Sequence, residues 1–176
     1  MDRTTVTDIK TEVTKRIEAK CDIQHNLHHI QSVTKNALDI SQKYDVDTNL
    51  IEAICYVHDL TYTVHNPSIK TYIFEGKYIA AILNKFLSIF NINNIEKEII
   101  INACRKHPHS FPFRKLNRNS DIYTKILQDA DTLDYFSERR INNFIKNNTF
   151  GLFNLSRLLR IIRSRFINYF LNLPPH

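Results

Sequence analysis

A histidine and an aspartate stand side by side at the end of an apolar run, at His58-Asp59. The run covers residues 50–60 and has the composition of a buried segment. Burying an unpaired carboxylate is expensive, so a ligand that engages both side chains would explain their position. Such pairs also arise by chance, so this pair indicates a metal site only if further ligand-type residues occur at suitable places in the chain. His29 and the stretch 128–134, which contains the sequence Gln-Asp-Ala-Asp-Thr-Leu-Asp, supply them.

Together, His29, His58, Asp59 and one aspartate of 128–134 would form a mixed site of imidazole and carboxylate ligands. This set leaves room for water on a six-coordinate ion, and it suits Mn²⁺, Fe²⁺, Co²⁺ or Mg²⁺ better than a closed structural zinc site. Adjacent His and Asp residues can both bind one ion where a helix ends, because the last turn need not keep helical geometry. The residues alone leave open which aspartate is the fourth ligand.

The elements that must position these residues are expected to be helices. The 176 residues include only 2 glycines, too few for a barrel with many tight turns or for a glycine-rich phosphate loop. Apolar residues recur at helical spacing, so we expect an all-α protein of about six to eight helices, forming a single domain over residues 1–176. The expected helices cover about residues 4–20, 22–44, 48–58, 67–90, 95–106, a segment from a cap at Ser120 through 134, and 154–171.

The segments between these helices are expected to be irregular. Residues 61–67 form an irregular stretch directly after the His-Asp pair. The two prolines of the loop 107–113 and the residues before them resist helix, and residues 142–148 form a polar piece. The last expected helix, 154–171, is rich in arginine. Its arginines indicate the polar face of an amphipathic helix.

Charge and cysteine usage indicate the partners and the compartment. A net charge of +6 favours an anionic partner, either a phosphorylated small molecule or nucleic acid. The cysteines lie far apart and are expected to be reduced thiols. Cys55 and Cys104 each lie three residues before a histidine, which would allow a thiolate ligand, but small apolar core residues are the favoured interpretation. Without a visible signal peptide or transmembrane run, we expect a cytoplasmic protein that does not bind membranes.

The order H…HD…D in segments 25–33, 53–60 and 125–134 resembles the HD superfamily of metal-dependent phosphohydrolases. The resemblance covers about residues 22–140. The loop that begins His107-Pro-His-Ser-Phe is similar to a loop of the small bacterial-type branch, some members of which are nucleotide pyrophosphatases. The resemblance to the HD superfamily implies a compact HD-type helical bundle with one divalent metal ion. The implied ligands are His29, His58, Asp59 and Asp131.

Local context selects among neighbouring candidates for these ligands. In the family the first histidine precedes a valine by four residues, which favours His29 over His25 because Val33 fits. The last ligand follows an alanine and precedes a leucine two residues on, which favours Asp131 over Asp129. Where the family often has a glycine two residues after the HD pair, this chain has Thr61 followed by a tyrosine.

The implied activity is phosphate ester or anhydride hydrolysis. A divalent ion lowers the pKa of a bound water and polarises a phosphoryl oxygen. We expect this water to attack a small phosphorylated substrate, with a nucleotide as the first candidate. The protein would then act as a pyrophosphatase, phosphatase or phosphodiesterase. Besides Asp59, the expected catalytic residues are His107 as a phosphate contact and Glu75 or Asp134 as general acid or base, with Asp129 as a further candidate for that role. Weaker phosphate candidates are Lys77, Arg105, Arg114 and Lys115.

The alternative hypothesis is a helical module that keeps a metal and binds RNA or DNA without catalysis. It depends on Arg157, Arg160 and Arg163, which fall on one side of the last expected helix and could face phosphates. A set of ligands that leaves metal positions open argues against this hypothesis, because a structural role needs no open positions.

Overall fold

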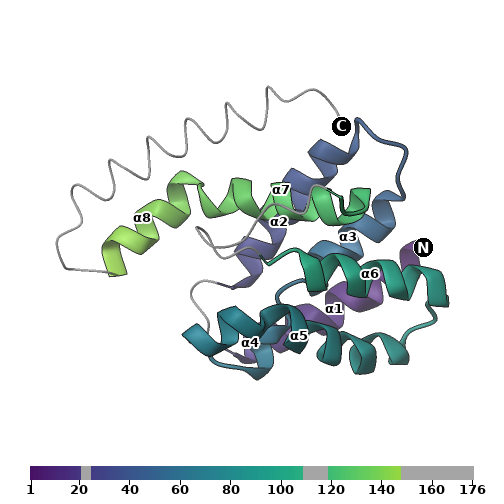
Figure 1. Cartoon of the computed structure of the whole chain (residues 1–176), viewed down its shortest axis with the longest axis horizontal. Helices are drawn as coiled ribbons and strands as arrows, with labels where there is room; N and C mark the ends of the chain where they lie inside the picture. Colours follow the sequence, from purple (N-terminus) through teal and green to yellow (C-terminus); the bar gives the residue numbers. More distant parts are fainter. Residues whose placement is uncertain (21–24, 109–118, 148–176) are drawn as a thin grey trace. The chain divides into compact units, whose positions relative to one another are not determined.

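The structure, a computed structural model, describes residues 1–20, 25–108 and 119–147, and all regular secondary structure within them is helical (Figure 1). The expected all-α class is therefore confirmed. The elements are α1 (Arg3–Ala19), α2 (Leu27–Ser41), α3 (Thr48–Val57), α4 (Thr61–Val64), α5 (Ile69–Phe86), the short 3-10 helix η1 (Leu87–Ile89), α6 (Asn94–Lys106), α7 (Ile122–Tyr135) and α8 (Glu138–Asn147).

Two helix starts differ from the expectation, because other residues provide the caps. The helix α2 begins at Leu27, where the side chain of Asn26 accepts a hydrogen bond from the backbone N–H of His29 at 3.1 Å. His25 consequently precedes the helix, and Asp22, the expected cap, lies outside the described residues. The helix α5 begins at Ile69, after a cap by Ser68.

The expected irregular stretches also contain helix. Residues 61–64 form the single turn α4, directly after the His-Asp pair. Most of the polar piece 142–148 belongs to α8, which begins at Glu138. The arginine-rich segment 154–171 lies outside the described residues. None of the helices in the described part of the chain has the length and hydropathy needed to span a bilayer.

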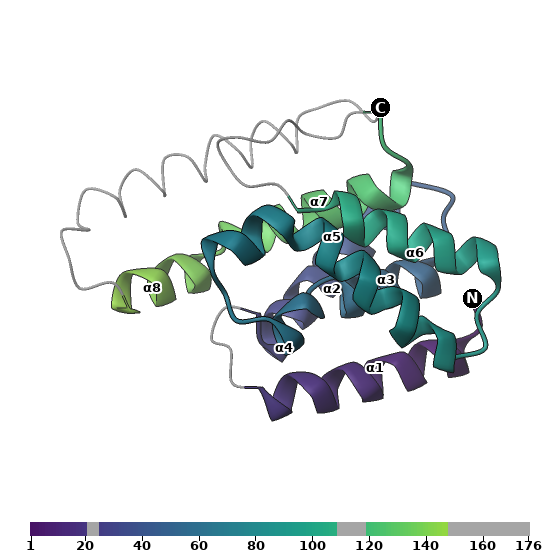
Figure 2. The same ribbon diagram turned by 60° about the horizontal axis from the view of Figure 1, so that its bottom comes forward.

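The chain divides into two compact units, Met1–Ala130 and a second that begins at Asp131 within α7. The expectation of a single domain over 1–176 stays a prediction. In the first unit α3 packs against α1, α2 and α6 (Figures 1 and 2). Residues 50–60 are all buried, which is why this helix can occupy the core. A buried α3 places the His-Asp pair at its end inside the protein.

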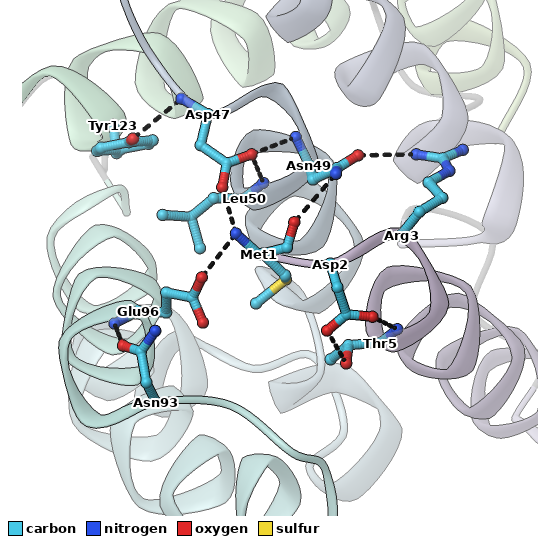
Figure 3. Close-up of polar contacts among 10 residues, drawn as sticks. All are labelled: Met1, Asp2, Arg3, Thr5, Asp47, Asn49, Leu50, Asn93, Glu96 and Tyr123. Atoms are coloured by element: carbon cyan, nitrogen blue, oxygen red, sulfur yellow. Dashed lines mark hydrogen bonds and ion pairs between the residues drawn. The ribbon is translucent and has the colours of Figure 1, made fainter.

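The amino end of the chain ties several helices of this unit together (Figure 3). The Met1 ammonium group forms ion pairs with Asp47, the N-cap of α3, and with Glu96 of α6, the latter at 2.6 Å. The backbone N–H of Asp47 donates to the hydroxyl of Tyr123 in α7 at 3.2 Å. Hydrogen bonds to Asp47 and Glu96 raise the pKa of the Met1 amine, so the ammonium form is favoured in the folded state.

Candidate metal centre

His58 and Asp59 lie where α3 ends. His58 is the C-cap of α3 and is fully buried, while Asp59 is 4% exposed. The chain then turns at once into α4, with the backbone N–H of Tyr62 donating to the carbonyl of Asp59 at 3.0 Å. The helix end therefore presents both side chains from consecutive residues, as the sequence predicted.

His29 reaches the same place from the first turn of α2, and its side chain is buried as well. Its Nε2 atom lies 3.1 Å from Oδ2 of Asp59 and 3.3 Å from Nε2 of His58. The remaining side of this triangle, from His58 Nε2 to Asp59 Oδ2, is 3.3 Å. Three potential ligand atoms from two helices thus converge inside the core.

The hydrogen bonding of His58 fixes which of its nitrogens is available. Its Nδ1 atom lies 2.7 Å from the carbonyl oxygen of Cys55. A carbonyl can only accept, so Nδ1 carries the hydrogen and, in the neutral imidazole, Nε2 keeps a lone pair. Metal-binding histidines are oriented in this way by a carbonyl partner on the other ring nitrogen.

The triangle fits a metal ion. Ligand atoms about 2.1 Å from an ion and 90° apart lie roughly 3.0 Å from one another, close to the separations found here. Although both histidine nitrogens lie near it, Asp59 Oδ2 has no hydrogen bond of acceptable geometry within the described part of the chain. A buried carboxylate oxygen in this state is costly unless a cation engages it.

The carboxyl group of Asp59 is held in its charged form. Burial by itself would raise its pKa, but the imidazoles of His58 and His25 and the contact with His29 outweigh that cost. The pKa of Asp59 therefore lies well below its usual range, and the side chain is a carboxylate at neutral pH. This is the form that can bind a metal ion.

The fourth implied ligand, Asp131, is the residue of α7 that follows Ala130. Ala130 is buried in the first unit, and its carbonyl accepts a hydrogen bond from Asn36 of α2 at 3.2 Å. Asp131 itself begins the second unit, so its assignment as a ligand stays a prediction. Asp129 has a half-buried side chain one position before Ala130.

Among the expected acid–base residues, Glu75 is connected to the metal centre through an aromatic group. Glu75 is buried on α5, and its charge raises the pKa of the Tyr62 hydroxyl in α4. Burial, Glu75 and Asp59 all raise the pKa of Tyr62, so this hydroxyl stays protonated and both carboxylates lie close to it. Asp134, by contrast, is buried beside Arg139 at 3.5 Å and Arg140 at 3.6 Å.

A row of aromatic rings, which the sequence did not suggest, begins at this centre. His25 stands edge-on to His29 at 6.4 Å between ring centroids, and it stacks on Tyr62 at 3.5 Å. Tyr72 follows at 5.9 Å from Tyr62 and is 41% exposed. The only signal in the sequence was the position of Tyr62, three residues after Asp59.

His107 is buried at the C-cap of α6, and its ring centroid lies 5.1 Å from that of His58. Potential ligand atoms of His58, Asp59 and His107 all lie within 4.8 Å of one another. Lys77 and Arg105, two of the weaker phosphate candidates, are exposed on α5 and α6. The other two, Arg114 and Lys115, lie outside the described residues.

The sequence as a whole matches the family model for the HD domain over residues 26–135. The chain belongs to the HD family. The matched region begins at Asn26, the N-cap of α2, and ends at Tyr135, the last residue of α7, so it contains each implied metal ligand of this HD domain. The family assignment from the order of the motifs is therefore confirmed.

Solved structures of similar fold include a predicted HD superfamily hydrolase from an uncultured Thermotogales bacterium. Its TM-score is 0.61 at 19% identity, with 97% of this chain and 95% of that chain covered. YpgQ from Bacillus subtilis, in complex with ADP, has a TM-score of 0.61 at 20% identity, with coverage of 96% and 92%. A further structure of YpgQ has a TM-score of 0.59 at 22% identity, again covering 96% and 92%. These likenesses establish a shared fold.

Among curated proteins, no relative of significant sequence similarity was found.

Proposed function

We propose that this HD domain is a metal-dependent phosphohydrolase that uses one divalent ion, Mn²⁺, Fe²⁺, Co²⁺ or Mg²⁺. The proposed ligands are His29, His58, Asp59 and Asp131. The observation that carries the proposal is the convergence of two imidazole nitrogens and one carboxylate oxygen, at separations of 3.1 and 3.3 Å, inside the core. The likeness in fold to a predicted HD superfamily hydrolase supports the same reaction class.

The chemistry divides between the ion and the side chains. When bound, a divalent ion supplies a water of lowered pKa and polarises a phosphoryl oxygen. Asp59, His29 and His58 would hold the ion, and their burial excludes bulk water. Glu75, which is buried and close enough to Tyr62 to raise the pKa of its hydroxyl, is our proposed general base for the attacking water. The ion pairs of Asp134 make it the less favoured base.

We propose a nucleotide as the substrate. Tyr72 offers an aromatic face at the exposed end of the row of rings that begins at the metal centre, and every nucleobase can stack on such a face. The net charge of +6 favours a polyphosphate. YpgQ, which shares the fold, was solved in complex with ADP.

The test begins with metal analysis of the purified protein, followed by a panel of nucleotides and phosphate esters in the presence of Mn²⁺. Products are identified as phosphate or pyrophosphate. His58→Ala and Asp59→Asn should lose metal and activity together, by more than the roughly 10–100-fold that loss of an outer partner costs. His28→Ala is the matched control, because His28 lies beside His29 on α2 but is exposed. Hydrolysis that survives Asp59→Asn would refute the proposal.

The nucleotide assignment has its own measurement. Tyr72→Ala should raise the KM for a nucleotide roughly 10-fold, since base–aromatic stacking contributes about 1–3 kcal/mol, and Tyr72→Phe should restore it. Inorganic tripolyphosphate, which has no base, should be hydrolysed equally by all three proteins. An equal loss with tripolyphosphate would show that Tyr72 supports the fold and not a base.

The same preparation tests the RNA- or DNA-binding alternative. That alternative predicts salt-sensitive binding of nucleic acid that survives Asp59→Asn and is lost when Arg157, Arg160 and Arg163 are replaced together. It also predicts no turnover on the panel. Turnover that depends on Asp59 excludes a module without catalysis.

A further inference from the structure

The helices α3 and α6 end in the same way. In each, a cysteine is followed three residues later by a histidine at the C-cap, Cys55 with His58 and Cys104 with His107. In each, the Nδ1 atom of the histidine lies 2.7 Å from the carbonyl oxygen of its cysteine. The two helices pack against each other, and the His58 and His107 rings, 5.1 Å apart between centroids, bring these equivalent ends together in the core.

The hydrogen bond at Nδ1 decides what His107 can do. Since the carbonyl of Cys104 can only accept, Nδ1 carries the hydrogen and, in the neutral ring, Nε2 has a lone pair. A lone pair can bind a metal ion, but it cannot donate a hydrogen bond to a phosphate oxygen. His107 is 2% exposed, so its ring lies in the core together with the other potential ligands.

The backbone around His107 also favours a cation. The C-terminal end of a helix carries a partial negative charge of roughly half an elementary charge, which attracts cations and repels anions. His58 and His107 are the C-caps of α3 and α6, and their ring centroids are 5.1 Å apart, so both rings lie beside such an end. A carboxylate oxygen of Asp59 belongs to the same group of closely spaced ligand atoms.

The position of His107 is fixed by a side chain of another helix. The side-chain Nε2 of Gln128, a buried residue of α7, donates to the carbonyl of Lys106 at 3.1 Å and lies 3.5 Å from the carbonyl of His107. These are carbonyls that the end of α6 leaves without partners inside the helix. The end of α6 is thereby held in place, and His107 with it.

We propose that His107 is a nitrogen ligand of the metal centre, through Nε2, in place of the phosphate contact expected from the sequence. This inference rests on the proposed function, which supplies the ion. In this proposal the end of α6 supplies a metal ligand through His107, as the end of α3 does through His58. The centre then draws ligands from both helix ends, as well as from α2.

Metal binding without substrate tests the proposal. Mn²⁺ affinity is measured by titration, and the nitrogen ligands of bound Mn²⁺ are detected by pulsed electron paramagnetic resonance. His107→Ala should weaken Mn²⁺ binding roughly 10-fold or more and remove one imidazole coupling. His65→Ala is the control, because His65 is half-buried, stacks on Tyr78 and belongs to neither group of closely spaced ligand atoms in the described residues. Unchanged affinity and couplings in a folded His107→Ala protein would overturn the proposal.

A measurement on the unaltered protein guards against a variant that fails to fold. In nitrogen-15 spectra of the histidine rings, addition of Cd²⁺ should shift the Nε2 resonances of both His58 and His107. A shift at His58 without one at His107 would overturn the inference while leaving the proposed function standing. If all variants, including His58→Ala and Asp59→Asn, still bound the metal ion, the proposed function itself would be refuted.

Discussion

Asp129 and Asp131 differ in the direction in which each can point from α7. Residues two apart on a helix are turned by about 200° from each other, so only one of this pair can face a given ion. We predict that Asp131→Asn weakens Mn²⁺ binding at least 10-fold, whereas Asp129→Asn changes it less than 2-fold. Titration with Mn²⁺ decides between them. The reverse order of effects would make Asp129 the ligand.

Glu52 of α3 is a second residue whose environment decides its charge. It is 7% exposed and forms ion pairs with Arg3 and with Lys10 of α1, the latter at 2.5 Å. Burial raises the pKa of Glu52, but Lys10 and Arg3 lower it by more than burial raises it. The pKa of Glu52 in the folded protein therefore lies below its usual value. A carboxyl with a depressed pKa stabilises the folded state above the unfolded pKa of about 4.3, and this stabilisation is lost as the pH falls through the folded pKa.

We therefore predict that Glu52→Gln is less stable than the unaltered protein at pH 7, by roughly 1–2 kcal/mol after solvent screening of the exposed Arg3. The difference should shrink as the pH falls below about 4, where the unaltered Glu52 becomes protonated too. Urea unfolding across this range measures it. A difference that stays constant with pH would show that the ion pairs do not stabilise the fold.

At the scale of elements, Gly76 sets how closely α5 approaches α6. A Cβ atom at this position would lie 2.4 Å from the carbonyl oxygen of Arg105, well inside van der Waals contact. In an exposed helix, replacing Gly with Ala stabilises by about 1 kcal/mol. Here the backbone contact reverses the sign, because α5 would have to move away from the helix that carries His107.

We predict that Gly76→Ala destabilises the protein by roughly 1–3 kcal/mol, the usual range for overpacking. Thermal unfolding measures it, and Lys77→Ala, at the next and exposed position of α5, should stay within about 0.5 kcal/mol of the unaltered protein. A stabilised Gly76→Ala protein would mean that the two helices are farther apart than the structure places them.

At the scale of the whole molecule, the metal centre links folding to metal concentration. Three of the proposed ligand atoms come from α2 and from the end of α3, both within the unit Met1–Ala130. An ion that binds only the folded state stabilises it by about 2.7 kcal/mol at 100 times its dissociation constant. For a chain of this length that corresponds to a rise in Tm of roughly 5–10 °C.

We predict this rise on addition of Mn²⁺ and its reversal by a chelator. His58→Ala should unfold at a Tm that does not depend on Mn²⁺, and His28→Ala should respond as the unaltered protein does. Scanning calorimetry at several Mn²⁺ concentrations provides the measurement. An equal response of His58→Ala would place the ion elsewhere in the chain.

Most helices could be predicted from the sequence, because the spacing of apolar residues within each segment indicates a helix and the chain has few glycines to interrupt one. The expected helices 4–20, 48–58 and 95–106 match α1, α3 and α6 to within about two residues, the usual uncertainty of helix ends. The starts of α2 and α5 differ because several polar residues compete for each cap, and the backbone geometry chooses among them.

The sequence by itself determined which residues could bind a metal ion and that they belong to an HD domain, since residue types and their order are written in the chain. Only the tertiary structure decided that Nε2 of His29, Nε2 of His58 and Oδ2 of Asp59 meet. The observations behind the proposed role of His107, its Nδ1 hydrogen bond and the packing of α3 against α6, likewise exist only in the folded chain. Distances between segments far apart in sequence depend on packing, and packing is a property of the whole core.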